Sequence, residues 1–250
     1  MKIEFECQAC CDVGCVRSHN EDMILFNGKL LRNQEFHGCY FLGDKGRFVV
    51  AVADGMGGHA GGEMASEMAL QFLDVFVASL PENISQNDFT NAFHRWINRT
   101  HSLINQKGDD VPTYKGMGTT LVGLLAIENH VYAFNVGDSR LYRYRDGILK
   151  QLSIDHSMRE KYHNPSIPSN VIYNSLGGGG NSAFADLQDL TEKIFADDRF
   201  LICSDGLCDM LSDDELCALC EEKSSATQFV NNAKDAGGTD NISVIIIDVR

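Results

Sequence analysis

Apolar side chains recur at helical spacing in two long stretches of the first half of the chain. In residues 60–80 one face carries Ala65, Met68, Phe72 and Phe76. In the next stretch one face carries Phe89, Phe93, Trp96, Ile97, Leu103 and Ile104. Ser85 and Asp88 precede this second face with the spacing of an N-terminal capping box. The pattern therefore predicts two long amphipathic helices, each covering one side of a sheet.

Short apolar runs separated by turn residues follow between positions 119 and 152. The runs cover residues 120–127, 131–136, 141–145 and 148–152. The turns between them include Gly137-Asp138-Ser139 and Asp146-Gly147, and Asp-Gly between two apolar runs is a strong hairpin signal. We therefore predict an antiparallel meander of four strands in this region.

Two further helices are predicted near the C-terminus. Ser212 and Glu215 form another capping box before an apolar pattern, and a helix with Phe229 and Val230 stops at Gly237-Gly238. Helices grouped in pairs around hairpin-linked strands favour an α+β fold over a parallel α/β fold, which needs strict alternation. We expect a four-layer α-β-β-α sandwich of two antiparallel sheets flanked by helix pairs.

Length, charge and the absence of targeting segments limit the possible functions. The chain has 250 residues and is 44% hydrophobic, which suits one large domain over residues 1–250. A net charge of -14 disfavours nucleic acid or an anionic membrane as the partner. No transmembrane or signal segment is evident, so we expect a cytoplasmic protein. A monomer's core accounts for the amphipathic helix faces, so we expect a monomer.

Nine cysteines raise the question of disulfides or zinc. A chain of this size needs no disulfide for stability, so reduced thiols are expected. Cys7-x-x-Cys10 and Cys217-x-x-Cys220 have zinc-like spacing, but the first pair lies in a run of mixed polarity and the second in a helical pattern. The alternative is that these cysteines are small buried hydrophobic residues.

Acidic residues stand where apolar runs break into turns. Asn20-Glu21-Asp22 precedes residues 23–26, Asp54-Gly55 ends the run 48–53, and Asp138 follows Val136-Gly137. Asp205-Gly206 and Asp240-Asn241 flank two further runs. If the runs are strands of packed sheets, their ends can converge on one cleft. Convergent carboxylates repel one another unless a cation lies between them, and all-oxygen ligand sets suit Mg²⁺ or Mn²⁺.

These residues belong to one ordered series of motifs. The series is Arg17-x-x-Asn20-Glu21-Asp22, Asp54-Gly55-Met56-Gly57-Gly58-His59, Gly118-Thr119-Thr120, Gly137-Asp138-Ser139-Arg140, Asp155-His156-Ser157, Ser204-Asp205-Gly206 and Gly238-Thr239-Asp240-Asn241. In it the chain resembles the metal-dependent Ser/Thr protein phosphatases of type 2C, especially the bacterial single-domain members. The resemblance runs from about Gln8 to Val249.

The resemblance implies a set of metal ligands at one end of the sandwich. Asp54 would bridge two Mn²⁺ or Mg²⁺ ions, with Glu21 and the Gly55 carbonyl on one ion and Asp205 and Asp240 on the other. Glycine suits position 55 because its backbone can turn sharply and offer its oxygen. The remaining acidic residues would have auxiliary parts: Asp22 and Asp209 would hold metal-bound waters, and Asp138 would hold a third ion.

The resemblance also implies the reaction. Two adjacent ions would lower the pKa of a bridging water, which attacks phosphorus of phosphoserine or phosphothreonine in proteins, opposing a cognate Ser/Thr kinase. Arg17 would grip the phosphoryl oxygens. Many eukaryotic relatives have a histidine where this chain has Met56, so the general acid stays open. His59 is a candidate for this general acid. The alternative is that His59 only caps or packs against the start of a helix.

Two loops, residues 157–170 and 177–180, have unusual sequences. The segment 157–170, where many bacterial relatives have a longer flap beside the active site, is short here and contains Pro165 and Pro168. A reduced flap would open the cleft. Residues 177–180 are four glycines that lack the Lys-Ser/Thr of a nucleotide-binding loop, so a turn is expected there.

Three other functions fit parts of the sequence. Cys11-x-x-Gly14-x-x-Arg17-Ser18 matches the Cys-x5-Arg-Ser loop of cysteine-dependent phosphatases, but no helical pattern follows it. A catalytically silent scaffold would lack one or more ligands, and every expected ligand is present. A calcium-binding protein would pack its acidic residues into one loop of regular spacing, whereas here they are dispersed.

Overall fold

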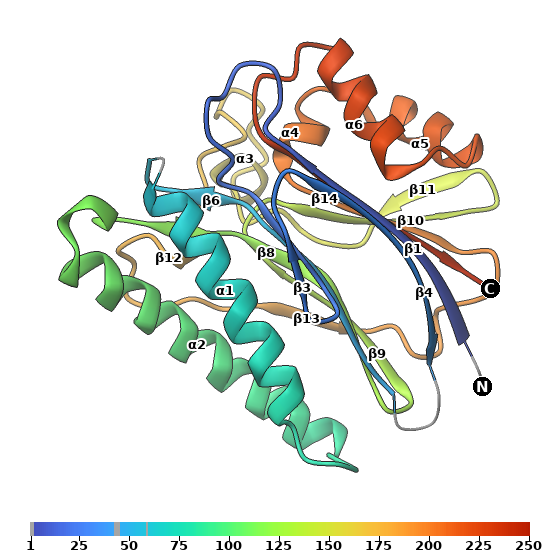
Figure 1. Ribbon diagram of the computed structural model, residues 1–250, viewed down its shortest axis with the longest axis horizontal. Helices are drawn as coiled ribbons and strands as arrows, with labels where there is room; N and C mark the ends of the chain where they lie inside the picture. The colour runs from blue at the N-terminus through green and yellow to red at the C-terminus, as the bar shows by residue number, and fades with distance from the viewer. Residues whose placement is uncertain (1–2, 43–45, 59) are drawn as a thin grey trace.

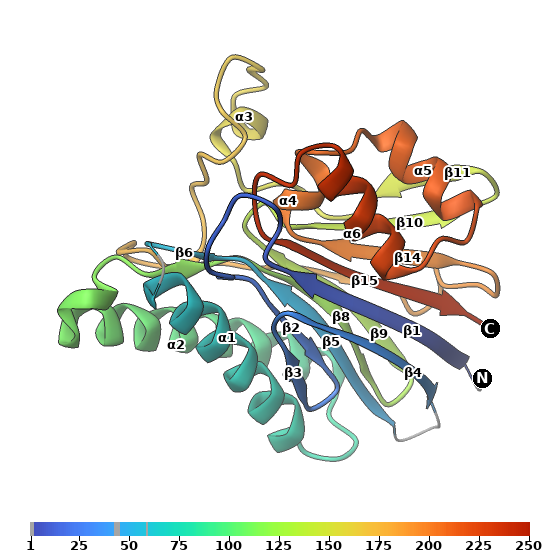
Figure 2. The ribbon, with the colours of Figure 1, turned by 45° about the horizontal axis from the view of Figure 1, so that its top comes forward.

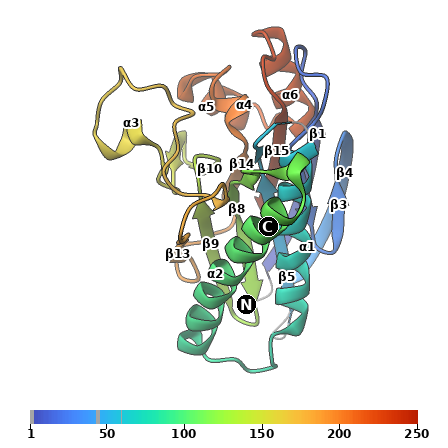
Figure 3. The ribbon, with the colours of Figure 1, turned by 90° about the vertical axis from the view of Figure 1, so that its left-hand side faces the viewer.

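Two six-stranded sheets pack face to face between two layers of helices (Figures 1 and 3). The computed structural model describes residues 3–42, 46–58 and 60–250. The first sheet has the order β11 (Ile148–Gln151), β10 (Arg140–Arg145), β14 (Arg199–Cys203), β15 (Ile242–Val249), β1 (Ile3–Asp12) and β4 (Gln34–Leu42). The second has the order β13 (Asp186–Asp189), β9 (His130–Val136), β8 (Leu121–Ile127), β5 (Arg47–Ala53), β2 (Met23–Phe26) and β3 (Lys29–Leu31).

Short strands form a third sheet at one end of the molecule, next to the ends of β5 and β8. This small sheet contains β12 (Leu176–Gly177), β7 (Gly118–Thr119) and β6 (Gly55–Met56). All strand pairs of the described ranges are antiparallel. The expected α+β class with two antiparallel sheets is therefore confirmed.

Helices cover the outer face of each large sheet. α1 (Ala60–Ser79) and α2 (Gln86–Asp110) lie on one side, followed by the 3-10 turn η1 (Pro112–Tyr114). α4 (Asp205–Cys208), α5 (Asp213–Glu221) and α6 (Ala226–Asp235) lie on the other. The capping box of Ser212 and Glu215 is confirmed, because Ser212 Oγ accepts from Glu215 N and the Glu215 side chain accepts from Ser212 N. At α2, Ser85 Oγ accepts from Asp88 N as the N-cap, but Asp88 bonds the Ser85 hydroxyl instead of its N–H, so the predicted box is only half formed. In the described part of the chain, no helix combines the length and apolarity needed to cross a membrane.

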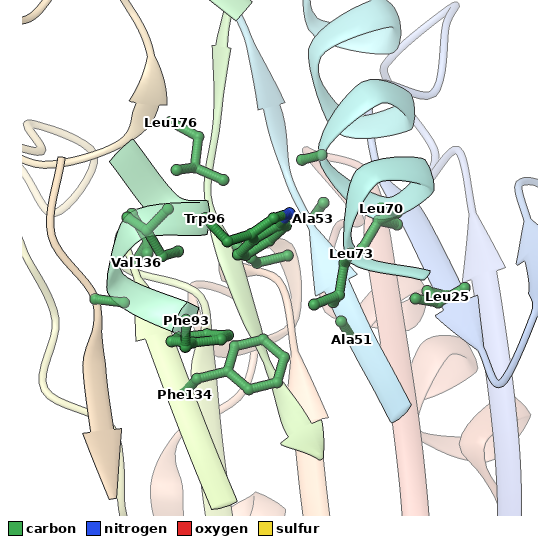
Figure 4. Packing of buried hydrophobic residues seen from close by; sticks show 14 of the residues in the cluster. Leu25, Ala51, Ala53, Leu70, Leu73, Phe93, Trp96, Phe134, Val136 and Leu176 are labelled. Carbon is green, nitrogen blue, oxygen red and sulfur yellow. The ribbon is translucent and has the colours of Figure 1, made fainter. Parts of the chain in front are cut away.

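Three apolar layers hold the sandwich together. The core under α1 and α2 includes Phe93, Trp96 and Phe134 (Figure 4). A second core lies between the two sheets, and a third lies between the first sheet and α4 to α6. Because the central strands are covered on both faces, their sequences are almost continuously apolar, as in Leu121–Ile127.

The predicted four-stranded meander is wrong. β8 pairs with β9 and β10 pairs with β11, but β9 and β10 belong to different sheets. Gly137, with φ of +102°, begins the crossing from one sheet to the other. A local turn signal does not distinguish a hairpin from such a crossing, because both need the same reversal of the backbone. The crossing places Asp138 at the end of the sandwich that carries β6 and β7.

The segment 157–170 projects from the body of the molecule (Figure 2). It contains the single turn α3 (Met158–Lys161), capped by Ser157. A bridge between Ser157 and Ile172 closes its base. The segment thus stands beside the end of the sandwich where β6, β7 and the Asp138 crossing lie.

Candidate active site

One pocket, of about 310 Å³, lies at this end of the sandwich. It is lined by all the residues for which metal ligation was predicted: Glu21, Asp54, Gly55, Asp138, Asp205 and Asp240. Arg17 and Met56 also line it, and Asn170 and Ile172 contribute the side next to the projecting segment. The acidic residues come from the ends of strands in both large sheets, so side chains far apart in sequence share one cavity.

Two threonines fix the turn that carries Asp54. The Asp54 N–H donates to Thr120 Oγ1 at 3.0 Å. The Asp54 carbonyl accepts from Thr119 Oγ1 and from the Thr120 N–H, both at 2.9 Å. Thr120 Oγ1 also bonds Ser139 Oγ at 2.7 Å, which ties this turn to the Asp138 crossing. No role was assigned to Thr119 or Thr120 from the sequence, because threonine next to a strand is an ordinary strand residue.

Glycines allow the start of α1 to pack against Glu21. A Cβ at Gly55 would lie 2.2 Å from Gly62 O, and a Cβ at Gly62 would lie 2.1 Å from Glu21 Oε2. Any side chain at either position would displace the Glu21 carboxylate or the turn at Gly55. The absence of side chains there places the Glu21 carboxylate and the Gly55 carbonyl at the same wall of the pocket.

Asn241 anchors the loop that carries Arg17 and Glu21. Its Oδ1 accepts from the Glu21 N–H at 2.9 Å, and its Nδ2 donates to the carbonyls of Val13 and His19 at 3.0 and 2.9 Å. The neighbouring Asp240 Oδ2 accepts from Arg17 Nη2 at 2.7 Å. The last motif of the chain therefore positions the first, although sequence reasoning gave Asn241 no role of its own.

Burial and mutual repulsion raise the pKa of four carboxyl groups in and beside the pocket: Asp22, Asp54, Asp138 and Asp205. Burial is the largest cause for Asp54, whose pKa is raised well above its ordinary range, with contributions from Asp22, Asp205 and Asp138. The pKa of Asp22 and of Asp138 rises to about 7 and that of Asp205 to about 6, again chiefly through burial. Asp54 and Asp205 share a hydrogen bond between their carboxyl groups, so a proton relieves part of the repulsion.

The chemistry of these groups suits divalent cations. A concentration of carboxylates with raised pKa values is stabilised by any hard cation that competes with the protons. Within residues 3–42, 46–58 and 60–250, no three acidic, histidine or cysteine side chains already stand close enough together to enclose one ion. Two of these carboxylates have other partners instead: Asp240 bonds Arg17, and Asp54 bonds Asp205. Ion binding would therefore replace these two contacts.

A comparison with known protein families shows the family to which the chain belongs. The family model described as protein phosphatase 2C matches residues 29–242. The chain belongs to the protein phosphatase 2C family. It is 28% identical to the serine/threonine phosphatase stp of Listeria monocytogenes over 257 residues, covering 95% of this chain and 93% of that protein.

Solved structures of phosphatases align with the same fold. The S. agalactiae serine/threonine phosphatase aligns with a TM-score of 0.83 and 26% identity, over 98% of this chain and 100% of that one. The catalytic domain of the protein phosphatase PstP, in complex with two manganese ions, aligns with a TM-score of 0.74 and 28% identity, over 99% of each chain. The expected bacterial-type, metal-dependent serine/threonine phosphatase is confirmed by these matches.

Two auxiliary acidic residues of this phosphatase lie outside the pocket lining. Asp22 is only 1% exposed, and its Oδ2 accepts from Ser204 Oγ at 2.7 Å. Because Asp205 and Asp240 raise its pKa, it lies within electrostatic reach of the ligand cluster. Asp209 is exposed at the end of α4, where its Oδ1 accepts from Ser169 Oγ of the projecting segment at 3.5 Å. His59, the candidate general acid, lies outside the described residues.

The cysteine-phosphatase alternative is wrong for this phosphatase. Cys11 is 2% exposed within β1, and burial beside Asp22 raises the pKa of its thiol to about 11. Its sulfur contacts Asn20 Nδ2 and Ser243 Oγ, both at 3.3 Å, whereas Arg17 lies in the pocket beside Asp240. The segment 18–22 leads from Arg17 into β2 and not into a helix. The thiol is therefore neutral and buried, away from the place where a phosphate would bind.

Proposed function

We propose that this member of the phosphatase 2C family hydrolyses phosphoserine and phosphothreonine in proteins at the pocket described above. The observation that carries the proposal is that five carboxylates and a glycine carbonyl, from separate strand ends, line one cavity together with Arg17. Carboxylates alone would repel a phosphate dianion, so a pocket of this composition binds phosphate only when cations and the arginine offset its charge.

The residues divide naturally between two ions. Glu21 and the Gly55 carbonyl, which share one wall, would hold one, and Asp205 and Asp240 would hold the other, with Asp54 common to both. Asp138, at the crossing between sheets, would hold a third. When bound, Mn²⁺ or Mg²⁺ ions neutralise these carboxylates and activate water for attack on phosphorus. The two manganese ions of the similar PstP structure support a pair of ions in this pocket.

Arg17 would bind the phosphoryl oxygens of the substrate. Its side chain is 51% exposed at the pocket rim, and only Nη2 bonds Asp240. The guanidinium therefore has further N–H groups available to face the cavity, and its planar fork matches two phosphate oxygens. As negative charge shifts to the leaving oxygen and the phosphoryl group, this contact would strengthen.

Substitution of Arg17 tests the assignment. With a phosphothreonine peptide and saturating Mn²⁺, Arg17→Ala is expected to lower kcat/KM by about a hundredfold, the effect of losing one stabilising donor group, and Arg17→Lys by about tenfold because charge without the fork remains. The measurement is phosphate release, with a chelator as the blank. Arg95→Ala, an exposed arginine on α2, is the matched control and should match the wild type. Full activity of Arg17→Ala at high Mn²⁺ would contradict the phosphate-binding role.

A second cavity adjoins the first and would hold the polypeptide around the phosphorylated residue. Its volume is about 450 Å³, and it shares Met56, Asn170 and Ile172 with the pocket of carboxylates. Val171 and Tyr173 line it and are 42% and 38% exposed. No acidic residue lines this cavity in the described part of the chain. It is therefore suited to an uncharged or apolar substrate side chain next to the phosphoresidue.

Removal of the Tyr173 ring should lower activity on phosphopeptides without changing activity on small-molecule phosphates. Tyr173→Ala is expected to lower kcat/KM for a phosphopeptide by about tenfold, since loss of one aromatic contact at such a surface costs more than 1 kcal/mol. Hydrolysis of an aryl phosphate, which does not reach this cavity, should stay unchanged. Tyr162→Ala is the control, because Tyr162 is exposed on the projecting segment but does not line the cavity. Equal losses on both substrates would point to a distorted active site instead.

A kinase must supply the phosphorylated substrates, so we infer that a cognate Ser/Thr kinase acts with this phosphatase in the cytoplasm. We also infer that the phosphatase works as a monomer. The apolar faces of α1 and α2 are used inside the core, which supports the monomer. Comparison of phosphoproteomes with and without the gene would identify the shared substrates. A dimer in size-exclusion chromatography coupled to light scattering would contradict the monomer.

A further inference from the structure

Two cysteines touch directly behind the metal-ligand cluster. The sulfur atoms of Cys203 and Cys208 are 3.4 Å apart. Cys203 is the fully buried last residue of β14, and Cys208 is the partly exposed last residue of α4. A disulfide needs a separation of about 2.05 Å, so a small approach of the two sulfurs would join them.

The sequence around α4 explains why these side chains meet. Ser204 is the N-cap of α4, so Cys203 precedes the cap and Cys208 is the fourth residue after it. These are the two positions of a hydrophobic staple, in which apolar side chains pack across the first turn of a helix. Two cysteines satisfy the staple as small apolar groups, and they also bring two thiols into contact.

The surroundings of Cys208 favour its reaction. Tyr142 Oη lies 3.6 Å from Cys208 Sγ, and Arg140 Nη1 donates to that hydroxyl at 3.0 Å. Cys208 is also the more exposed of the pair. It is therefore the thiol that an oxidant reaches, with Cys203 placed to react next.

We propose that Cys203 and Cys208 are a modification site, at which a hydroperoxide produces a reversible disulfide that weakens metal binding at Asp205. The Cys208 thiol attacks the peroxide O–O bond, giving a sulfenic acid and an alcohol, or water from hydrogen peroxide. Cys203 then attacks that sulfur and releases water, so two thiols and one hydroperoxide give one disulfide, one alcohol and one water. A dithiol reductant reverses the step by thiol–disulfide exchange.

The link to metal binding follows from the packing of α4. Asp205 and Gly206 lie between the two cysteines in sequence, and a Cβ at Gly206 would lie 2.0 Å from Asn241 O. This tight contact leaves no room for the turn to adjust on that side. When the sulfurs approach, the strain passes to Asp205 and to the segment Asp240-Asn241. Both aspartates belong to the proposed ligand set, so the oxidised protein should hold its ions less tightly.

The purified metal-free protein, treated with a small excess of hydrogen peroxide, provides the test. Peptide mapping by mass spectrometry should show Cys203 linked to Cys208, with loss of two hydrogen atoms from the intact protein. Calorimetric titration with Mn²⁺ should show an affinity about tenfold lower after oxidation, the scale seen when groups that orient metal ligands are disturbed, and dithiothreitol should restore it. These readouts do not depend on the proposed catalytic function.

Matched variants keep the inference open to contradiction. Cys208→Ala and Cys203→Ala retain a small apolar staple and should keep full Mn²⁺ affinity after peroxide. Cys39→Ser, which removes an exposed thiol on β4, should respond as the wild type does. Oxidation of Cys208 to sulfinic acid without the link, a disulfide between other cysteines, or unchanged Mn²⁺ affinity of the linked protein would each overturn the proposal.

Discussion

Asp54→Asn is expected to abolish phosphatase activity and to stabilise the metal-free protein at the same time. Asparagine keeps the size of the side chain and can donate to Asp205, but it removes the charge that both ions would share. A loss of about 4 kcal/mol of transition-state stabilisation, a modest share of what a metal pair supplies, lowers kcat by about a thousandfold. We therefore expect a fall of at least that size with a phosphopeptide.

The stability effect has the opposite sign because Asp54 sits among like charges. Its pKa is raised by burial and by Asp22 and Asp205, so at pH 8 its ionised form destabilises the fold. In a chelator, Asp54→Asn should raise the free energy of unfolding, because asparagine has no charge that must be buried beside the other carboxylates.

Urea denaturation with and without Mn²⁺ measures how the substitution changes the free energy of unfolding in each condition. Added Mn²⁺ should stabilise the wild type by about 2.7 kcal/mol at a hundred times its Kd, and should not stabilise Asp54→Asn. Asp109→Asn, an exposed carboxylate on α2, is the control for both assays. A variant that keeps substantial activity, or that loses stability in the chelator, would show that Asp54 does not bridge the cluster.

Stability of the metal-free protein is expected to fall as the pH rises from about 4 to about 7. The pKa values of Asp22 and Asp138 are about 7, and that of Asp205 is about 6, against about 3.9 in an unfolded chain. Between these limits the folded protein binds more protons than the unfolded one, so the free energy of unfolding decreases with pH. The stabilisation is complete below pH 4 and is lost as the pH passes 6 to 7.

The expected loss is at least about 3 kcal/mol between pH 4.5 and pH 8, after allowance for coupling among the groups. Mn²⁺ should remove most of the dependence above pH 7, because bound ions replace the protons. Urea unfolding in chelator at several pH values provides the curve. Asp138→Asn deletes one titrating group and should make the free energy of unfolding depend less steeply on pH. A metal-free protein that becomes more stable across this range would contradict the raised pKa values.

Helices and the layer order could be predicted from the sequence because their signals are local. The capping residues Ser85 and Ser212 mark helix starts, and the period of apolar residues in α1 and α2 is uninterrupted. β1 was not recognised as a strand. It lies between β15 and β4, and Cys7 and Cys11 face the core between the sheets while Cys10 faces the helices. Residues 4–9 nevertheless alternate between half-buried polar side chains (Glu4, Glu6 and Gln8) and buried apolar ones (Phe5, Cys7 and Ala9), so the strand pattern was present in the sequence and was overlooked.

The acidic residues of the site could be predicted because charge at strand ends is rare and conspicuous. The residues that hold them in place by hydrogen bonds could not be predicted. Asn241 bonds Glu21 across 220 positions, and Thr120 bonds Asp54 across 66. Amide and hydroxyl side chains at turns usually satisfy the local backbone, so nothing in the sequence marks these as long-range contacts. The contact between Cys203 and Cys208 is local, yet its cap-spanning geometry becomes visible only once the start of α4 is known.

The pairing of the first strand with the last has a consequence for biosynthesis. β15 lies between β14 and β1, and Phe5 is registered against Val249. An emerging polypeptide that lacks residues 240–249 cannot close this sheet, and its Arg17 loop has no Asn241 to anchor it. The carboxylate pocket therefore cannot form until residues 240–249 have been translated, so the slow, long-range closure of this sheet comes late in synthesis.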